Sequence, residues 1–351
     1  MCFLRALSLH HFRNHQKKTL FFSSGINYIH GENARGKTNL LEAIYLLIFG
    51  RSFRTPRLDE LILFGTSSFA IEAQFEKNGI EQVLKFEFES KKKKITHNAT
   101  TIFSLHHLLG IVNGVLISPE DRDLIMGDPS IRRQYLDLQI AQTNPLYLHH
   151  LLRYLKAMKQ RNALLRNQEK KTIEIWEEEM AHSAAYITCA RYQAIQELQL
   201  LSLDTLSREI DTLSLSYKTH APVQEKGNQK EYFLEKFSKY RMREYALGFT
   251  LVGPHRDDLE ILLGGRPARF FGSEGQKRCS ITALRFAQWK RLKEQTLESP
   301  LLCIDDVGVT LDAHREEKLL ASLGQIGQVF LTSPRLPTAT YIDTHFIHLD
   351  A

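Results

Sequence analysis

The sequence has little cysteine and no long uncharged apolar run. Four cysteines occur among 351 residues, with no C-x-x-C pair, at Cys2, Cys189, Cys279 and Cys303. This scatter argues against a disulfide framework and indicates reduced cytosolic thiols. No apolar run approaches the length needed to cross a bilayer, so we expect no membrane span. No basic stretch precedes a long apolar one at the N-terminus, so we expect no signal peptide and a cytoplasmic location.

Histidine is abundant, but its pattern does not suit metal binding. Several of the fifteen histidines form adjacent pairs, at 10–11, 106–107 and 149–150. Neighbouring residues point to different faces of a helix or strand, whereas a metal clamp needs i, i+4 spacing. We therefore interpret these side chains as surface or partly packed residues.

Composition is that of a globular protein larger than one typical domain. Apolar residues make up 43% of the chain and charged residues 25%. A length of 351 residues favours two compact units, or one domain with an insertion. The formal net charge of +6 is modest; it permits binding to nucleic acid without requiring it.

A complete G-x-x-x-x-G-K-[ST] phosphate loop lies near the N-terminus. Its residues are Gly31, Glu32, Asn33, Ala34, Arg35, Gly36, Lys37 and Thr38, followed by Asn39. An apolar stretch precedes it and a helical pattern follows, the strand–loop–helix context that gives the motif meaning. Backbone N–H groups would hold the phosphates of ATP. Lys37 would reach the β- and γ-phosphates, and the Thr38 hydroxyl would ligate Mg²⁺.

The chain alternates between two kinds of pattern. Residues 3–30 and 69–101 read as strands, with the four lysines of 91–94 at a hairpin tip that is either a solvated turn or a DNA contact. From 130 to about 210 the pattern is helical, and helix resumes up to 246. Strands are predicted again at 249–252 and 259–263. Two α/β halves thus flank a helical insertion and are expected to rejoin as one nucleotide-binding domain.

Paired carboxylates follow a second apolar strand. Asp305 and Asp306 come directly after the apolar run 301–304, which predicts a buried strand ending in two acids. Asp305 is placed to bind Mg²⁺, and Asp306 to polarise the attacking water as a catalytic residue with Lys37. Ser273, Gly275 and Gln276 open a further helix, which is either an ordinary cap or an anion-binding helix start.

In this order, the motifs resemble the ATP-binding-cassette ATPases of the SMC type, and more narrowly the recombination mediators of bacterial DNA repair. The resemblance covers nearly the whole chain. It is carried by the phosphate loop and by segments 12–14, 41–45, 52–54, 118–121, 132–137, 160–162, 253–258, 273–278, 305–306 and 311–315. It implies an α/β fold, an ABC/SMC-type P-loop ATPase head with a helical arm between its halves. The expected domains are 1–125 and 247–351 for the ATPase and 126–246 for the arm.

The resemblance also implies how the parts work. ATP and Mg²⁺ would drive homodimerisation, with the signature residues Ser273, Gly275 and Gln276 acting in trans on the partner's γ-phosphate. Asp312 would lie in a loop crossing the dimer interface, and Thr332 would be a switch residue near the γ-phosphate. Such a dimer would bind duplex and gapped DNA, help partner mediators load recombinase, and act in the SOS response. Slow hydrolysis would reset it.

The sequence departs from the family pattern at two positions, and alternative interpretations of its function stay open. Ala34 replaces a usual glycine and Thr310 a usual acid, which puts the hydrolysis rate in doubt. DNA contact without sequence preference is expected, and its candidates are Arg51, Arg54, Arg132 and Arg133, with Lys156, Lys159 and Arg161 on the arm. Each could instead be a salt-bridged surface arginine or lysine. A transporter's nucleotide-binding subunit is the main alternative, and a metabolic P-loop kinase the second.

Overall fold

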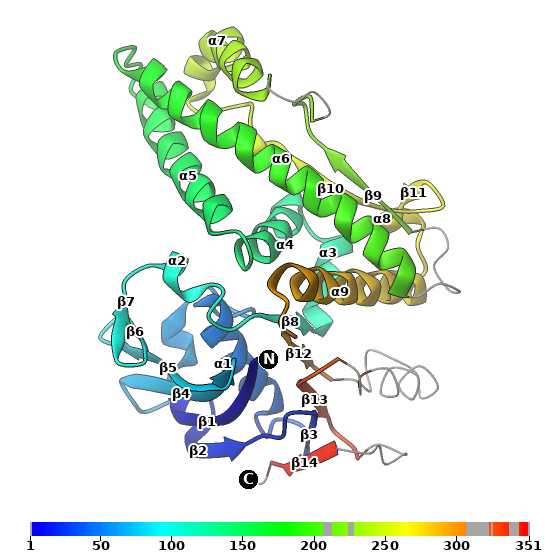
Figure 1. The fold of residues 1–351 in the computed structure, drawn as a ribbon. Helices are drawn as coiled ribbons and strands as arrows, with labels where there is room; N and C mark the ends of the chain where they lie inside the picture. The colour runs from blue at the N-terminus through cyan, green and yellow to red at the C-terminus, as the bar shows by residue number, and fades with distance from the viewer. Residues whose placement is uncertain are drawn as a thin grey trace. The chain divides into compact units, whose positions relative to one another are not determined.

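The structure is a computed structural model that describes residues 2–205, 213–223, 228–306, 323, 326–336 and 344–349. Two compact units make up the chain: residues 1–121 with 288–351, and residues 122–287. Residues 247–287, which the sequence pattern assigned to the ATPase, pack with the helices of the second unit. Figure 1 shows the fold as a ribbon.

The first unit contains two sheets. One is antiparallel, in the order β2-β1-β4-β5-β6-β7, and the other is parallel, in the order β14-β3-β13-β12-β8. The antiparallel strands are β1 (Cys2–Phe12), β2 (His15–Phe21), β4 (Ser68–Lys77), β5 (Ile80–Glu89), β6 (Lys92–His97) and β7 (Thr100–Ile102). The parallel strands are β3 (Ile26–His30), β8 (Gly114–Ile117), β12 (Leu301–Ile304), β13 (Val329–Ser333) and β14 (Thr344–His348).

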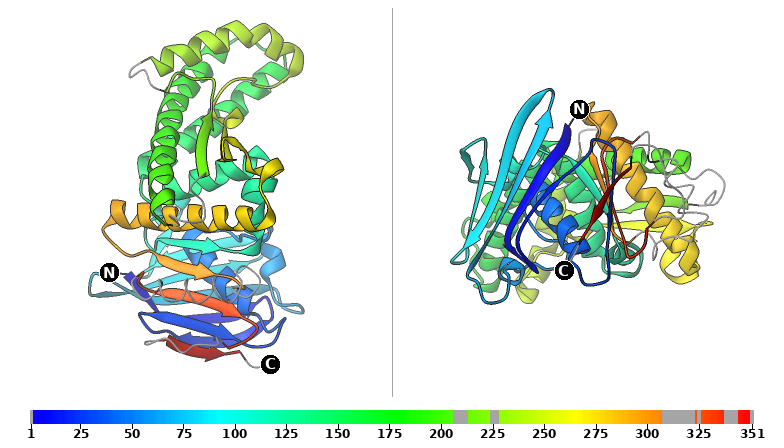
Figure 2. Two further views of the ribbon diagram at one scale, coloured as in Figure 1. Left: turned by 90° about the vertical axis from the view of Figure 1, so that its right-hand side faces the viewer. Right: turned by 90° about the horizontal axis from the view of Figure 1, so that it is seen from below.

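The parallel sheet confirms that the two ends of the chain rejoin. Strand β3 from the N-terminal part lies between β13 and β14 from the C-terminal part, in register Tyr28 to Leu331 and Tyr28 to Phe346. Helix α1 (Lys37–Phe49) packs against strands of both sheets, so nine of its 13 residues are buried (Figure 2). Short helices η1 (Leu58–Leu61) and α2 (Leu105–Leu108) precede β4 and β8, and η2 (Pro119–Arg122) follows β8.

The second unit is mainly helical, as predicted. Its elements are α3 (Asp123–Met126), α4 (Pro129–Ala141), α5 (Pro145–Arg166), α6 (Ile173–Thr205), α7 (Gln229–Leu247), η3 (Pro254–Arg256), α8 (Ala268–Phe271) and the first part of α9 (Glu274–Thr296). Helices α5 and α6 lie side by side (Figure 1). Helix α5 begins after Asn144, whose side chain caps the helix by accepting from the Tyr147 amide.

Two details of the second unit differ from the sequence pattern. The strand predicted at 249–252 does not form, because its amides bind side chains instead: Thr250 N donates to Asn162 and Leu251 N to Glu244. Within the predicted helical insertion, β9 (Leu213–Lys218) pairs with β10 (Asp258–Leu263), and β11 (Arg266–Pro267) completes a small sheet. The pairing of β9 with β10 joins residues 40 to 50 positions apart, which local periodicity does not encode.

Candidate functional site

The phosphate loop connects β3 to α1 and depends on its glycines. Gly36 has φ 91°, and a β-carbon there would lie 2.6 Å from both Asn14 Oδ1 and His15 Nε2. Gly31 has φ 154°, and a β-carbon would lie 2.8 Å from the Leu349 carbonyl oxygen. Both conformation and space therefore require glycine at these two positions. Ala34, the departure noted in the sequence, also takes a left-handed φ of 66°, and its side chain is exposed.

Lys37 lies at the start of α1, with its ammonium turned into the loop. Its Nζ donates to the carbonyl oxygens of Gly31, at 2.7 Å, and Glu32, at 2.8 Å. Partial burial lowers the pKa of Lys37, while the carboxylates of Asp306 and Asp305 act in the opposite direction. The ammonium therefore lies within the loop and in the field of the two acids.

The carboxylates meet the loop across neighbouring parallel strands. Thr38 Oγ1 donates to Asp305 Oδ1 at 3.0 Å, and Thr332 Oγ1 donates to the same oxygen at 2.6 Å. The Asp306 amide in turn donates to Thr332 Oγ1 at 2.8 Å. Burial raises the pKa of Asp305, the two hydroxyl bonds oppose this, and Glu120 and Asp306 raise it further. Three separate sequence segments thus form one polar cluster beside the loop.

The donor set of this cluster suits Mg²⁺. Mg²⁺ prefers oxygen ligands and is usually held by one or two protein groups together with substrate phosphates. The Thr38 hydroxyl and the Asp305 carboxylate already lie within hydrogen-bond distance of each other. A cation placed between them would replace that hydrogen bond and relieve the cost of burying the carboxylate.

A buried ion pair joins Arg13 to Glu42 on helix α1. Glu42 is fully buried, and Arg13 binds it with two hydrogen bonds of 2.8 Å and 2.7 Å. Ser52 Oγ donates to the same carboxylate at 2.5 Å. Arg54 donates to Asn39 at 2.9 Å and lies 3.6 Å from Glu42. The sequence segments 12–14, 41–45 and 52–54 therefore contact one another at α1, the helix that follows the loop. Residue spacing alone did not reveal this positioning role.

The signature segment is an exposed, capped helix start. Ser273 Oγ accepts from the Gln276 amide at 3.2 Å, and Gln276 Oε1 accepts from the Ser273 amide at 2.9 Å. This reciprocal pair is a capping box. The local structure of the segment is therefore that of an ordinary helix cap. Ser273, Gly275 and Gln276 are all exposed, and a β-carbon at Gly275 would meet nothing within 4 Å. The helix start is therefore open to a ligand outside its own unit.

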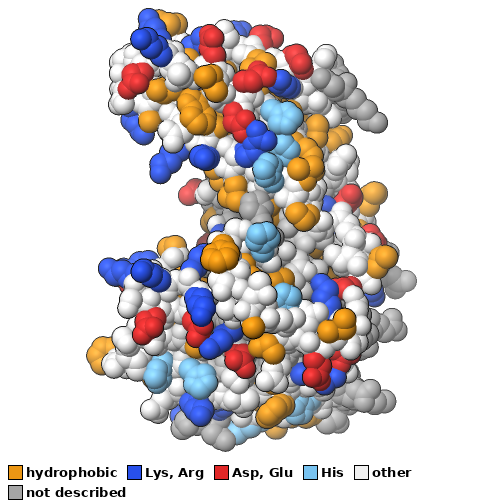
Figure 3. Space-filling view, turned by 60° about the vertical axis from the view of Figure 1, so that its left-hand side comes forward, with side chains coloured by type: hydrophobic (Ala, Val, Ile, Leu, Met, Phe, Trp, Pro, Cys, Tyr) orange, Lys and Arg blue, Asp and Glu red, His pale blue; other side chains and the backbone are white. Residues whose placement is uncertain are grey.

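Arginines that the sequence offered as DNA contacts differ in accessibility. Arg132 is 8% exposed and binds Asp258 through two hydrogen bonds. Arg133 donates to the Asp257 carbonyl oxygen at 2.8 Å. Arg51 is half-buried, and Arg54 belongs to the loop network described above. The face drawn in Figure 3 intersperses basic and acidic side chains, so charge alone does not mark one DNA surface there.

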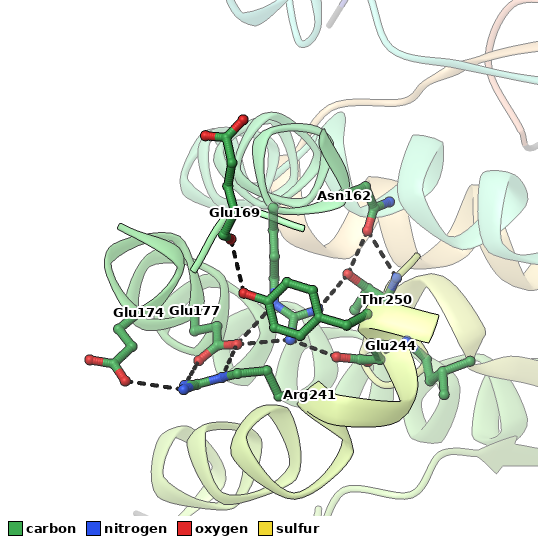
Figure 4. A network of polar contacts seen from close by, with 10 residues as sticks. Asn162, Glu169, Glu174, Glu177, Arg241, Glu244 and Thr250 are labelled. Carbon is green, nitrogen blue, oxygen red and sulfur yellow. Dashed lines mark hydrogen bonds and ion pairs between the residues drawn. The ribbon is translucent and has the colours of Figure 1, made fainter. Parts of the chain in front are cut away.

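Arg161 lies inside the second unit and cannot reach DNA. It is fully buried and donates to Glu177 at 2.8 Å, Glu244 at 2.6 Å and Thr250 Oγ1 at 2.9 Å. Figure 4 shows this network, in which Arg241 also binds Glu177. The expectation that Arg161 contacts DNA is wrong: two buried carboxylates, from helices far apart in sequence, hold its charge.

The 253–258 segment, the most distinctive of the motifs, is a structural turn. Gly253 has φ 133°, and a β-carbon there would lie 2.2 Å from Tyr154 Oη. The Tyr154 hydroxyl bonds to His255 Nδ1 at 2.6 Å, and His255 Nε2 lies 3.1 Å from the Thr250 carbonyl oxygen. Burial, together with a smaller effect of nearby arginines, lowers the pKa of His255 to about 4. Both ring nitrogens are therefore engaged within this unit.

Several predicted residues lie outside the described part of the chain. Asp312, the predicted interface residue, and Thr310, the departure before it, belong to 307–322. Their predicted roles stay predictions. In the described part, no helix is long and apolar enough to cross a bilayer.

The parallel sheet, the phosphate loop and the acids after β12 define an ATPase head of the ABC/SMC class. The RecF/RecN/SMC N terminal domain family matches residues 3–346. The Smc head domain of Pyrococcus furiosus has the same fold, with TM-score 0.55 and 17% identity over 95% of this chain and 90% of that one.

Closer similarity is to one family within this class. The "DNA replication and repair protein RecF" of Protochlamydia amoebophila is 47% identical over 97% of this chain and 96% of its own length. That of Chlamydia caviae is 38% identical, covering 97% and 94%. A solved structure titled "recombination mediator protein RecF-ATP in RecFOR pathway" has TM-score 0.92 and 32% identity, covering 99% and 95%. The chain belongs to the RecF family of DNA replication and repair proteins.

Proposed function

We propose that this protein is an ATP-gated DNA-binding dimer of recombinational repair. The observation that carries the proposal is the cluster of Thr38, Asp305 and Thr332 at the phosphate loop, because Mg²⁺ prefers oxygen ligands such as these hydroxyl and carboxylate groups. Lys37 would turn from its loop carbonyls to the β- and γ-phosphates. The ATP-bound RecF relative supports this assignment.

The site of one chain is incomplete without a second copy. The exposed N–H groups at the start of α9 suit an anion, and Ser273 offers a hydroxyl beside them. In the proposed dimer, Ser273, Gly275 and Gln276 of one copy would contact the γ-phosphate on the other copy's loop. Asp312 would lie at this interface. Asp306 would polarise the attacking water, so that slow hydrolysis separates the copies.

The dimer would bind duplex and gapped DNA without sequence preference, and would help partner mediators load recombinase in the cytoplasm during the SOS response. The relative named as a mediator in the RecFOR pathway supports the partner assignment. Among the arginines first considered, Arg51, Arg54 and Arg133 remain candidates for phosphate contact. The paired and buried Arg132 is the least suited. Membership in the RecF family disfavours a transporter subunit.

Sedimentation velocity tests the proposal. Asp306→Asn protein should bind ATP, hydrolyse it slowly and sediment as a dimer only when ATP and Mg²⁺ are present. The same samples should bind a gapped duplex more tightly with ATP than without it, and affinity should fall steeply with salt. A protein that stays monomeric with ATP, and binds the gapped duplex equally well with and without ATP, would contradict the proposal.

A further inference from the structure

Two histidines from distant parts of the chain, His30 and His348, meet beside the start of the phosphate loop. His30 ends strand β3, and His348 ends the neighbouring parallel strand β14 (Figure 1). The two residues are register partners, so their side chains extend from the same face of the sheet. Their Nδ1 atoms lie 3.2 Å apart. The order of the strands thus brings two ring nitrogens to one point.

This separation fits two ligands of a single metal ion. Histidine nitrogens bind Zn²⁺ at about 2.0–2.1 Å, so two of them on one ion lie about 2.9 Å apart at a right angle and about 3.4 Å apart in a tetrahedron. The ring centres are 4.7 Å apart and the ring planes tilt by 40°, so the rings lie side by side rather than end to end. An N–H in such a ring points past its partner and makes a poorly aligned hydrogen bond. Two lone pairs in the same arrangement converge on one ion.

The chemistry of the pair also suits a metal. Burial is the main cause that lowers the pKa of His30, with a smaller contribution from His348, so the His30 ring is neutral at neutral pH. Neutral imidazole is the commonest metal ligand. His30 is half-buried and His348 exposed, so an ion can enter from solvent. Among the described residues, no group of three histidine, cysteine or carboxylate side chains is placed to hold a metal, so water would complete the coordination.

We propose that His30 and His348 form a binding site for a divalent transition-metal ion of the class of Ni²⁺, Cu²⁺ and Zn²⁺. Imidazole suits these ions, whereas Mg²⁺ and Ca²⁺ prefer oxygen ligands. The ion would join β14 to β3, where the Leu349 amide already donates to the His30 carbonyl oxygen at 2.9 Å. Since Gly31 follows His30 and begins the phosphate loop, the ion would fasten β14 to the strand that carries the loop. The site uses other residues and another ligand chemistry than the proposed Mg²⁺ site.

Calorimetric titration of the full chain with Ni²⁺, in excess Mg²⁺ and with no added histidine tag, tests the proposal. His30→Gln and His348→Gln should each weaken the tightest binding step about tenfold or more, because the second metal–ligand bond is intramolecular. The double variant should lose little more than either single variant, since both ligands act on one ion. The matched control is His182→Gln, an exposed histidine whose ring lies 5.2 Å from that of His150 in the second unit. It should keep the wild-type affinity.

Cu²⁺ counts the ligands without relying on a variant. With less than one equivalent of Cu²⁺, electron spin-echo modulation of the wild type should show two coordinated imidazoles, and His348→Gln should show fewer. Circular dichroism in a chelator checks that each variant is folded. A single coordinated imidazole in the wild type would overturn the proposal. Unchanged Ni²⁺ affinity in the double variant would also overturn it, as would an equal loss in His182→Gln.

Discussion

Thr38 and Asp305 are 267 positions apart in the chain and share a hydrogen bond of 3.0 Å. One stands at the start of α1 after the phosphate loop, and the other at the end of β12. Strand β13 lies between β12 and β3, and its Thr332 hydroxyl bonds to the same Asp305 oxygen. The distance between the ATP loop and its acid is thus set by the order of parallel strands.

Removal of the Thr332 hydroxyl tests whether that residue couples the two acids. In Thr332→Val, the Asp306 amide loses its acceptor and Asp305 loses one donor. We expect the free energy of unfolding to fall by about 1–3 kcal/mol, the cost of an unpaired buried polar group. ATP hydrolysis should slow as well, because Asp306 loses its fixed position. Thr332→Ser keeps the hydroxyl and should retain most of both, as measured by chemical denaturation and phosphate release. Equal defects in the two variants would show that the hydroxyl is not responsible.

Two defective chains should complement each other if the ATP site is shared. Lys37→Ala should lose the response to ATP, and Ser273→Arg should bind ATP as a monomer without dimerising. A mixed dimer would contain one intact site, with Lys37 from one chain and Ser273 from the other. We therefore expect the mixture to regain part of the ATP-dependent dimer in sedimentation. Lys93→Ala, an exposed lysine of the first unit, is the control and should dimerise normally. A mixture that forms no more ATP-dependent dimer than either variant alone would contradict contact in trans.

The sequence predicted the parts of this protein that are local. The loop 31–38 and the acids after β12 follow from short motifs, and the structure brings Thr38 and Asp305 together as expected. The interactions of the arginines could not be predicted in this way. Arg132 binds a carboxylate 126 positions away, and Arg161 binds one 83 positions away. Spacing along a helix shows that an arginine is present, but tertiary packing decides whether an acid neutralises it.

Arg161 provides a stability prediction, because it pairs with two acids inside the second unit. In Arg161→Met, Glu177 and Glu244 lose their shared guanidinium. Breaking a buried pair leaves charge uncompensated, so we expect the free energy of unfolding to fall by about 3–5 kcal/mol. The control is Arg153→Met on the same helix, whose pair with Glu179 is 40% exposed at the arginine. That change should cost about 1 kcal/mol or less. Similar losses in denaturant titrations of the two variants would contradict this account.

His255 predicts how stability depends on pH. Its pKa is about 4 in the folded protein, mainly because of burial, against an ordinary value of 6.5. Above pH 6.5 the imidazole is neutral in both states. As pH falls from 6.5 to 4, the unfolded chain binds a proton that the folded chain does not, so the free energy of unfolding falls. The loss from this group reaches about 3 kcal/mol at most. Thermal unfolding across this range should show a shallower slope for His255→Gln than for the wild type. Identical slopes in the two proteins would contradict the assignment.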